Sequence, residues 1–415
     1  MKNIKFTFGI FLALLSLSIV FISCRKNKQA TVITSQQGEP NLPTTPYEYL
    51  QKHGVDNQIA TLGRVLFYDK TMSLNNAVAC GSCHKQEFAF ADNVRFNKGA
   101  NGVDLKRNSP SIQGIKGFFH QSMFNSGISS FVMTDGVPSV NNQAPVLLFW
   151  DGRQRSLMDM VLNPVLNHNE MNLPDFTTLV NRLTASSYYP SLFKNAFGDA
   201  GITKERIALA LEGFVCCLNT DNSNPVITDQ MNPNFSNNNT GNMGNPNNMG
   251  DPNSINTSTV ILTDLQQQGK DLFHNTYNCA TCHDPSNSGS YGTVSTPAQM
   301  FNIGLDEVYS DQGLGAITGR AGDKGMFKIP TLKNISLTAP YMHDGRYANL
   351  SEVLDHYSHG IAANANLSPQ FRNFDGTPKK LNIAPAEKVA LIAFLGTLTD
   401  NDFLNNPMYS DPFKK

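Results

Sequence analysis

The chain has little charge and no excess of either sign. Charged residues make up 16% of its 415 residues, with 32 Lys and Arg against 33 Asp and Glu, so the formal net charge is −1. This balance argues against a nucleic-acid-binding protein, because no basic footprint is present. Clear alternating strand patterns are rare, and there is a single tryptophan. Hydrophobic residues make up 40%, enough to bury real cores, which excludes wholesale disorder and a fibrous repeat.

Residues 1–23 have the pattern of an export signal. A basic start precedes an apolar run from Phe6 to Ile22, which ends just before Cys24. This resembles a bacterial lipoprotein signal with Cys24 as the lipidation site, so we expect a periplasmic protein that meets the membrane through a lipid anchor only. The run is marginal in length for a membrane span, and a retained anchor is the alternative. Residues 24–46 are polar and contain several prolines, which predicts a flexible tether.

Asparagine dominates the middle of the chain. Residues 219–260 keep no helical or strand period, which predicts a disordered linker or insert without a catalytic role. On either side, the same motifs recur in the same order: Gly-x-x-Leu-Phe, Cys-x-x-Cys-His and Asp-Gly-Arg. A duplicated domain explains this order. The expected parts are an N-terminal domain at 47–218, a C-terminal domain at 261–405 and a tail at 406–415.

Periodic apolar patterns indicate a mainly α fold. The segments 203–218 and 385–398 both have helical periodicity. The first of them contains Cys216 and Cys217, which are adjacent and therefore poorly placed for a disulfide. We expect these two cysteines to be small apolar residues of the core.

Four of the seven cysteines form two identical Cys-x-x-Cys-His groups. The groups are Cys80, Cys83 and His84 in the first half, and Cys279, Cys282 and His283 in the second. This is the attachment signature of haem c, in which both thiols bond to the porphyrin and the adjacent histidine ligates the iron. We therefore expect two cytochrome c-like domains, each with one covalently attached haem c. A four-cysteine zinc cluster and structural disulfides are the alternatives.

Further motifs resemble the bacterial dihaem cytochrome c peroxidase family, including its MauG-like branch. They are Arg107-Asn108-Ser109-Pro110, Phe149-Trp150-Asp151-Gly152-Arg153, Asn169-Glu170-Met171, Pro330-Thr331-Leu332-Lys333-Asn334 and the segment 339–345. The resemblance implies a first haem that meets hydrogen peroxide and a second haem that passes electrons to it. It also implies a small cytochrome c or a cupredoxin as the electron donor. Family members are often homodimers, although nothing in this chain indicates the oligomeric state.

The resemblance also implies roles for single residues. Glu170 would assist O–O cleavage, Arg107 would belong to the catalytic site, and Trp150 would relay electrons between the haems. Without the motifs around them, Glu170 would be a solvated loop residue and Trp150 a core residue. Calcium at the domain interface would have oxygen ligands, which this ion prefers. The implied calcium ligands are Asn108, Thr338 and Pro340.

The chain departs from the family pattern on the peroxide side. Family members usually have glutamine ten positions before the glutamate, where this chain has Met160, whose thioether accepts hydrogen bonds weakly and cannot donate. Many members also carry a histidine that blocks the first iron until the second haem is reduced. No histidine is present from Lys85 to Arg107. We therefore expect the first haem to be open at rest, and we expect His120, in an extra stretch, to have a surface or loop role.

The resemblance identifies Tyr357 as the second axial ligand of the second haem. It lies 14 positions after His343, where peroxidase members have methionine and MauG-like proteins have tyrosine. An axial phenolate would lower the potential relative to methionine. Met342, His356 and His359 are the competing ligands.

The leading hypothesis is an oxidoreductase of the cytochrome-c peroxidase type. It would reduce hydrogen peroxide to water with electrons from a small periplasmic redox protein. One alternative is MauG-like oxidation of a protein or organic substrate, which Tyr357 favours. Another is a non-catalytic dihaem electron carrier, which Met160 favours.

Overall fold

Helices dominate the secondary structure, as the sequence predicts. The structure is a computed structural model that describes residues 37–42, 57–115, 147–218, 262–283 and 300–414. The expected signal with Cys24, the asparagine-rich linker and His120 lie outside the described residues. The described sheet structure consists of β1 (Met300–Phe301) and β2 (Phe327–Lys328), which pair antiparallel.

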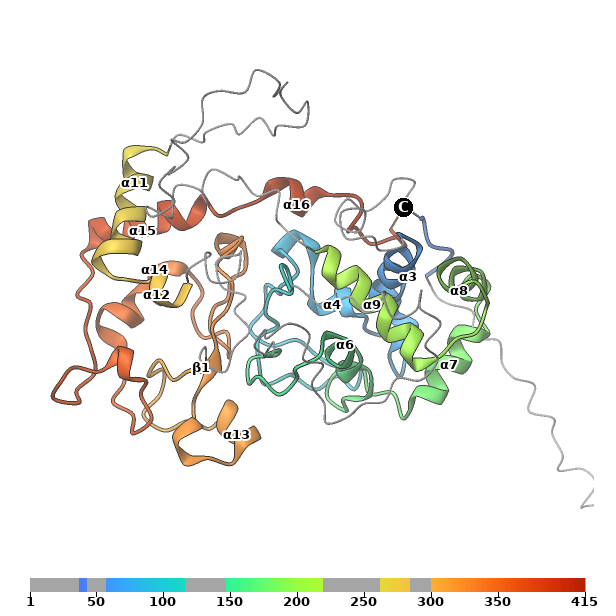
Figure 1. Ribbon diagram of the computed structural model, residues 1–415, viewed down its shortest axis with the longest axis horizontal. Helices are drawn as coiled ribbons and strands as arrows, with labels where there is room; N and C mark the ends of the chain where they lie inside the picture. The colour runs from blue at the N-terminus through green and yellow to red at the C-terminus, as the bar shows by residue number, and fades with distance from the viewer. Residues whose placement is uncertain (1–36, 43–56, 116–146, 219–261, 284–299, 415) are drawn as a thin grey trace, which may run out of the picture. The chain divides into compact units, whose positions relative to one another are not determined.

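The N-terminal half, residues 57–218, is built from helices of moderate length (Figure 1). They are α3 (Asn57–Tyr68), η1 (Lys70–Met72), α4 (Cys80–Cys83), η2 (Gln86–Phe88), α6 (Leu157–Leu166), α7 (Phe176–Thr184), α8 (Tyr189–Phe197) and α9 (Lys204–Cys217). The start of α9 follows from its sequence, because the Thr203 hydroxyl accepts a hydrogen bond from the Arg206 amide at 3.2 Å. The helix expected over 203–218 is thereby confirmed.

The C-terminal half, residues 262–398, has shorter helices joined by longer irregular segments. They are α11 (Asp264–Asp271), η3 (Leu272–Thr276), α12 (Ala280–His283), α13 (Leu314–Thr318), η5 (Ala321–Asp323), η6 (Ile335–Leu337), α14 (Leu350–Asp355), η7 (His356–Gly360), η8 (Pro369–Phe371) and α15 (Pro385–Gly396). The last of these confirms the helix expected over 385–398.

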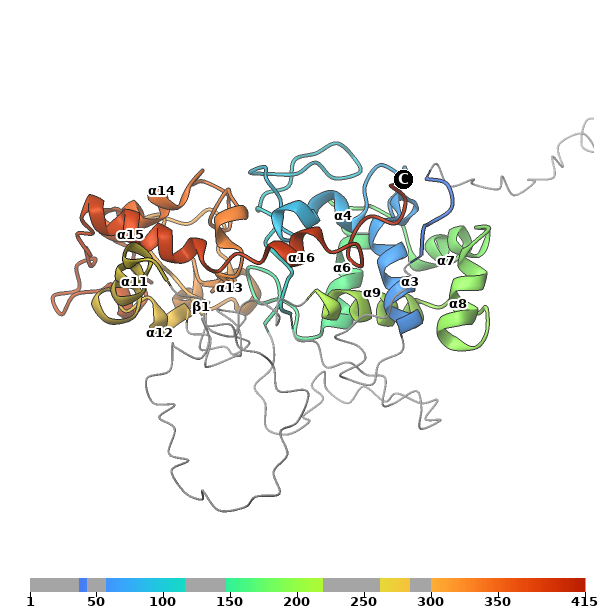
Figure 2. The ribbon, with the colours of Figure 1, turned by 90° about the horizontal axis from the view of Figure 1, so that it is seen from above.

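The two halves repeat one helix crossing. In each half, the Gly-x-x-Leu-Phe helix packs against a later helix, α3 against α9 and α11 against α15 (Figures 1 and 2). A Cβ atom on Gly63 would collide with the Ala210 carbonyl, and one on Gly269 with the Ala390 carbonyl. Glycine therefore sets the distance between the backbones at the same point of both crossings.

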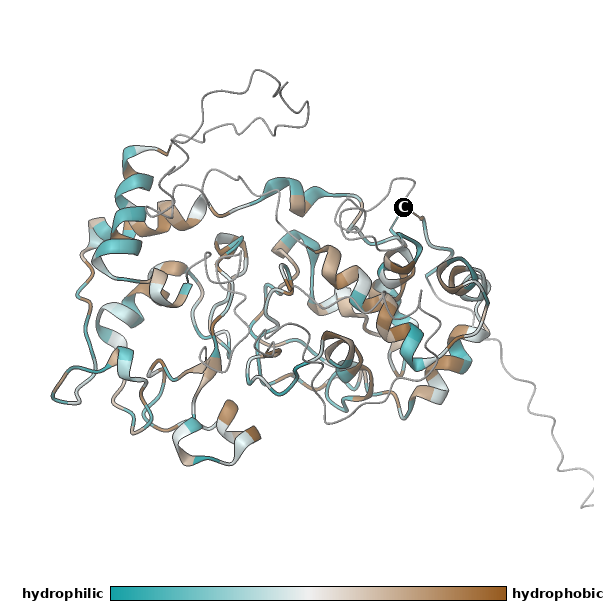
Figure 3. Ribbon diagram, in the orientation of Figure 1, coloured by the Kyte–Doolittle hydropathy of each residue, from teal (hydrophilic) through white to brown (hydrophobic). Residues whose placement is uncertain are grey.

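Each half has its own apolar core. The N-terminal core includes Leu66 and Phe214, and the C-terminal core includes Phe273 and Phe394. In Figure 3, α6 of the N-terminal half is strongly hydrophobic, whereas α11 of the C-terminal half is largely hydrophilic.

The end of the chain packs on the N-terminal half. Phe403, in α16 (Asn401–Asn405), belongs to the N-terminal core, and the Tyr68 hydroxyl donates to the Tyr409 carbonyl at 2.7 Å. The segment expected as a tail, 406–415, therefore has specific contacts over its described part.

Within the described residues, no helix is long and apolar enough to cross a membrane.

Candidate functional site

Each Cys-x-x-Cys-His group forms or adjoins a single helical turn, α4 in the first group and α12 in the second. Residues three apart lie on one side of such a turn, so the two cysteines of a group can reach one edge of a ligand. The Nδ1 atom of His84 lies 2.9 Å from the Phe90 carbonyl oxygen. Donation through this hydrogen bond leaves Nε2 as the free ligand atom. The first group therefore has the donor set and the imidazole orientation that haem c requires.

Burial keeps both histidines in the form that ligates iron. It lowers the pKa of His84, and it lowers the pKa of His283 to about 4, because the charged imidazolium is disfavoured away from water. Neutral imidazole is the ligating species.

The cysteines agree with thioether attachment rather than with the alternatives. No disulfide joins any of the six cysteines in the described ranges. In the same ranges, no three His, Cys, Asp or Glu side chains gather closely enough to hold a metal ion, as a zinc cluster would require. Cys216 and Cys217 are buried, which confirms their expected place in the core, and the Cys217 thiol donates to the Gly213 carbonyl.

One cavity is lined by both attachment groups, by Tyr357 and Met342, and by the candidates for catalysis and calcium binding. Its volume is about 1860 Å³. Pockets for one drug-sized ligand measure roughly 300–1,000 Å³, so this cavity has room for more than one such group. Both Cys-x-x-Cys-His groups face it, together with many apolar side chains. The residues present thus fit two haem c groups.

Glu170 is the candidate proton-transfer group in this cavity. Its Oε1 accepts a hydrogen bond from Asn167 Nδ2 at 2.8 Å. Burial raises its pKa, an effect that the charge of Arg153 and the hydrogen bond from Asn167 offset in part. Met160, on α6, is buried and lines the same cavity. A half-buried carboxyl of raised pKa is suited to take up and release a proton.

Gly99 fixes the backbone that carries Glu170. A Cβ atom at position 99 would collide with the Asn169 carbonyl, and the next amide, that of Ala100, donates to the Glu170 carbonyl at 2.7 Å. We expect Gly99→Ala to slow the reaction with peroxide by about 10²-fold, the effect of a misplacement of roughly 1 Å. Stopped-flow measurement of the haem spectrum tests this. Gly322→Ala is the control, because a Cβ there has open space, and equal rates for the two variants would contradict the prediction.

Arg107 joins the two halves through ion pairs. Its Nη1 donates to Asp151 at 2.6 Å, and its Nε and Nη2 donate to the two carboxylate oxygens of Asp311 at 2.6 and 2.8 Å. These contacts raise the pKa of Arg107 despite its partial burial. All three guanidinium nitrogens are thus occupied, which favours a role in positioning over direct catalysis.

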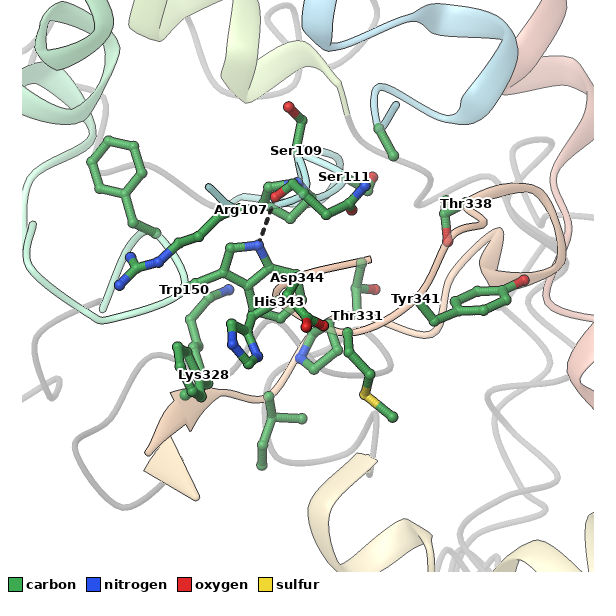
Figure 4. A pocket seen from close by; sticks show the side chains of 18 of the residues that line it. Arg107, Ser109, Ser111, Trp150, Lys328, Thr331, Thr338, Tyr341, His343 and Asp344 are labelled. Carbon is green, nitrogen blue, oxygen red and sulfur yellow. Dashed lines mark hydrogen bonds between the residues drawn. The ribbon is translucent and has the colours of Figure 1, made fainter. Parts of the chain in front are cut away.

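Trp150 is held by one residue from each half. Its Nε1 donates to the Asn108 carbonyl at 2.9 Å, drawn as a dashed line in Figure 4, and its own carbonyl accepts a hydrogen bond from the Lys328 amide at 2.8 Å. Nearby, the Asn108 amide donates to the His343 carbonyl at 2.8 Å. The indole therefore lies at the seam between the halves, in the wall of the cavity.

The calcium candidates Asn108, Thr338 and Pro340 share this cavity wall. Asn108 is buried, and its Nδ2 donates to the Val94 carbonyl at 3.0 Å. This hydrogen bond orients the amide so that Oδ1 is the atom left for a cation, which calcium's preference for oxygen requires.

Tyr357 faces the second Cys-x-x-Cys-His group. It lies in η7, its ring stacks on Phe371 with centroids 6.0 Å apart, and it lines the cavity. Burial raises its pKa, with a further contribution from Cys279 and Cys282, which places its hydroxyl near the attachment cysteines.

The competing ligands differ in access to the cavity. His356 does not line it, and its Nε2 lies 3.0 Å from the Ile303 carbonyl oxygen. His359 is exposed and does not line it either. Met342 is therefore the competitor that shares the cavity with Tyr357.

Comparison with known proteins agrees with this site. The family model for di-haem cytochrome c peroxidase matches residues 57–225. The methylamine utilization protein MauG of Methylophilus methylotrophus is 27% identical over 341 residues, 82% of each chain. Cytochrome c551 peroxidase of Nitrosomonas europaea is 26% identical over 321 residues, 76% of each chain. A crystal structure of a MauG-like protein associated with microbial copper homeostasis is 28% identical, with a TM-score of 0.66, and the match covers 90% of this chain and 97% of that one.

The helical fold and the paired attachment groups are those expected of a c-type cytochrome. The chain is similar to the di-haem cytochrome c peroxidase family, including its MauG-like branch. This similarity supports two haem c groups and an oxidoreductase activity.

Three residues of the site did not emerge from the sequence. Asp311 binds Arg107, Gly99 supports Glu170, and Lys328 extends into the cavity. Of these three, only Lys328 could have been suspected from the sequence, because it lies two positions before the Pro330-Thr331-Leu332-Lys333-Asn334 motif.

Proposed function

We propose that the protein is a dihaem c-type peroxidase, which reduces hydrogen peroxide to water with electrons from a small cytochrome c or cupredoxin. The observation that carries the proposal is the single cavity that joins both Cys-x-x-Cys-His groups and has Glu170 and Tyr357 in its lining. Haem iron, when bound, supplies the electron transfer and the binding position for a peroxide oxygen. Relatives named cytochrome c551 peroxidase support the same reaction.

Glu170 moves the proton in this proposal. Hydrogen peroxide takes up two electrons and two protons to give two molecules of water. The Glu170 carboxylate accepts the proton of the near oxygen and donates it to the leaving oxygen. Asn167 holds the carboxylate by its 2.8 Å hydrogen bond. Because Met160 cannot donate a hydrogen bond, Glu170 acts without the glutamine that is usual in the family.

Electrons enter through the second haem and reach the first by way of Trp150. In this assignment, the domain at 261–405 transfers electrons and the domain at 47–218 reacts with peroxide. Trp150 is supported as the relay by its hydrogen bonds to Asn108 and Lys328, which fix the indole between the halves. Arg107 positions the two halves through Asp151 and Asp311.

The spectrum of the resting protein tests the axial ligands. The first haem is expected to be high-spin, because the segment 85–107 has no histidine to block the iron. The second is expected to be low-spin with Tyr357 as ligand. We expect Tyr357→Phe to remove that low-spin signal in electron paramagnetic resonance, since phenylalanine has no ligand atom. Tyr309→Phe is the control. Tyr309 is near enough to Tyr357 to contribute to its raised pKa, but it does not line the cavity. An unchanged signal in Tyr357→Phe would refute the assignment.

Export, lipidation of Cys24 and calcium binding belong to the same proposal. The N-terminal sequence supports a periplasmic lipoprotein. Asn108, Thr338 and Pro340 support a calcium ion near Trp150, since all three line the cavity wall with it.

A second candidate function is MauG-like oxidation of a protein or organic substrate, which the tyrosine at position 357 favours. Measuring continuous oxidation of an electron donor distinguishes these two functions. A peroxidase mixed with peroxide oxidises a reduced cytochrome c or cupredoxin continuously. A protein that reacts with peroxide and then remains in a long-lived oxidised state without donor turnover has the MauG-like chemistry. A protein that does not react with peroxide is an electron carrier, and the proposal is then wrong.

A further inference from the structure

Lys328 extends from the C-terminal half into the haem cavity. It lies in β2 opposite Met300, and its amide donates to the Trp150 carbonyl at 2.8 Å. Its side chain lines the cavity, and Figure 4 shows it beside Trp150 and His343. Lys328 is thus fixed by its backbone at the seam between the two halves.

Most cations around the cavity already have carboxylate partners. Arg107 pairs with Asp151 and Asp311. The other pairs are Arg153 with Asp151, Arg346 with Asp306 and Asp344, Arg95 with Asp344, and Lys98 with Asp104.

Lys328 differs from these cations. Its side chain is half-buried, its ammonium group has no hydrogen-bond or ion-pair partner among the described residues, and burial lowers its pKa to about 8. Lys106 and Lys379 also line the cavity without a carboxylate partner among the described residues. Lys106 is exposed, so water can solvate its charge, and neither residue donates its backbone amide to Trp150 as Lys328 does. An enclosed ammonium is costly unless an anion is paired with it. The described residues supply no such anion to Lys328, and a group that fills the cavity can provide one.

We propose that Lys328 binds a haem propionate at the seam beside Trp150. Each haem carries two propionate carboxylates, and a charge-assisted hydrogen bond from an ammonium to a carboxylate is among the stronger polar contacts in proteins. Lys328 would then neutralise this carboxylate and attach the haem edge to β2, which also binds the Trp150 backbone. The inference rests on the two haems that the family implies, and it does not depend on the peroxidase reaction.

The test compares Lys328→Gln, Lys328→Arg and the control Lys324→Gln in the haem-loaded protein. Lys324 is exposed, does not line the cavity and lies in the same half. Removing a cation beside a haem favours the more positive ferric state, so Lys328→Gln is expected to lower the midpoint potential of one haem in an optical redox titration. Lys328→Arg and Lys324→Gln are expected to keep the potentials of the unmodified protein. Equal potentials in Lys328→Gln and Lys324→Gln would overturn the proposal.

Resonance Raman spectra give a second readout, which does not need the glutamine variant. The propionate bending band reports the polar partner of the carboxylate. We expect this band to shift in Lys328→Arg, where a guanidinium replaces the ammonium, and to stay in place in Lys324→Gln. An unshifted band in Lys328→Arg would overturn the proposal. If the potential shifts in a protein that fails to turn over peroxide, the Lys328 site stands and the proposed reaction is wrong.

Discussion

Replacing Glu170 with glutamine is expected to slow the reaction with hydrogen peroxide by about 10²–10⁴-fold, the usual contribution of a positioned acid–base group. The amide keeps the shape of the side chain and its place beside Asn167, but it cannot accept the peroxide proton. Haem content is expected to remain unchanged, because Glu170 belongs to neither Cys-x-x-Cys-His group. Stopped-flow mixing of the haem-loaded variant with peroxide measures the rate.

The pH dependence follows from the same carboxyl. Burial raises the pKa of Glu170, more than Arg153 and Asn167 lower it. The carboxylate is the form that accepts the proton, so the rate should fall as the pH falls through this raised pKa. In Glu170→Gln, the slow residual reaction with peroxide should continue, but its rate should no longer fall at low pH.

Glu87→Gln is the matched control for Glu170→Gln. Glu87 is exposed in η2, close in sequence to the first Cys-x-x-Cys-His group, and it does not line the cavity. The Glu87→Gln substitution therefore removes the same charge outside the cavity. If Glu170→Gln and Glu87→Gln react with peroxide at the same rate, Glu170 is not the proton-transfer group.

Replacing Gly63 with alanine should lower the free energy of unfolding by about 1–3 kcal/mol, the usual cost of overpacking. The added Cβ collides with the Ala210 carbonyl, which is part of the α9 backbone and cannot rotate away. Gly269→Ala should have an effect of the same sign, because the Ala390 carbonyl occupies the equivalent position in the second crossing. Chemical denaturation followed by circular dichroism measures both changes.

Gly322→Ala controls for the general effect of adding a methyl group. A Cβ at Gly322 has no neighbour within 4 Å. We expect this variant to match the unmodified protein closely. Gly63→Ala and Gly269→Ala variants as stable as Gly322→Ala would show that the crossings do not depend on glycine.

The sequence predicts those parts of the site in which the residues must lie close together along the chain to do their chemistry. Two thioethers and an adjacent imidazole must come from one turn, so Cys80, Cys83 and His84 can be identified without a structure. Apolar patterns likewise identified the helices that became α9 and α15. α15 buries one face, whereas α9 is buried on all sides from Ile207 to Cys217. Glu170 and Tyr357 needed the family resemblance as well, since a single carboxyl or phenol has no spacing of its own.

The contacts that the sequence could not predict join residues far apart in the chain. Arg107 and Asp311 are 204 positions apart, and no local pattern relates them. The lack of a partner for Lys328 among the described residues could not be predicted either, because it depends on where the carboxylates around the cavity lie in the fold. Gly99 could not be identified either, since only the fold brings the Asn169 carbonyl against it.

Titration of the fully reduced protein with hydrogen peroxide tests the proposed function most directly. Two ferrous haems hold the two electrons that one peroxide needs, so one equivalent of peroxide should convert both haems to the ferric form. Addition of a reduced small cytochrome c or cupredoxin should then restore the ferrous spectrum and allow a second cycle. A protein whose haems stay ferrous after one equivalent, or that oxidises only with excess peroxide and loss of the haem spectrum, would contradict a dihaem peroxidase.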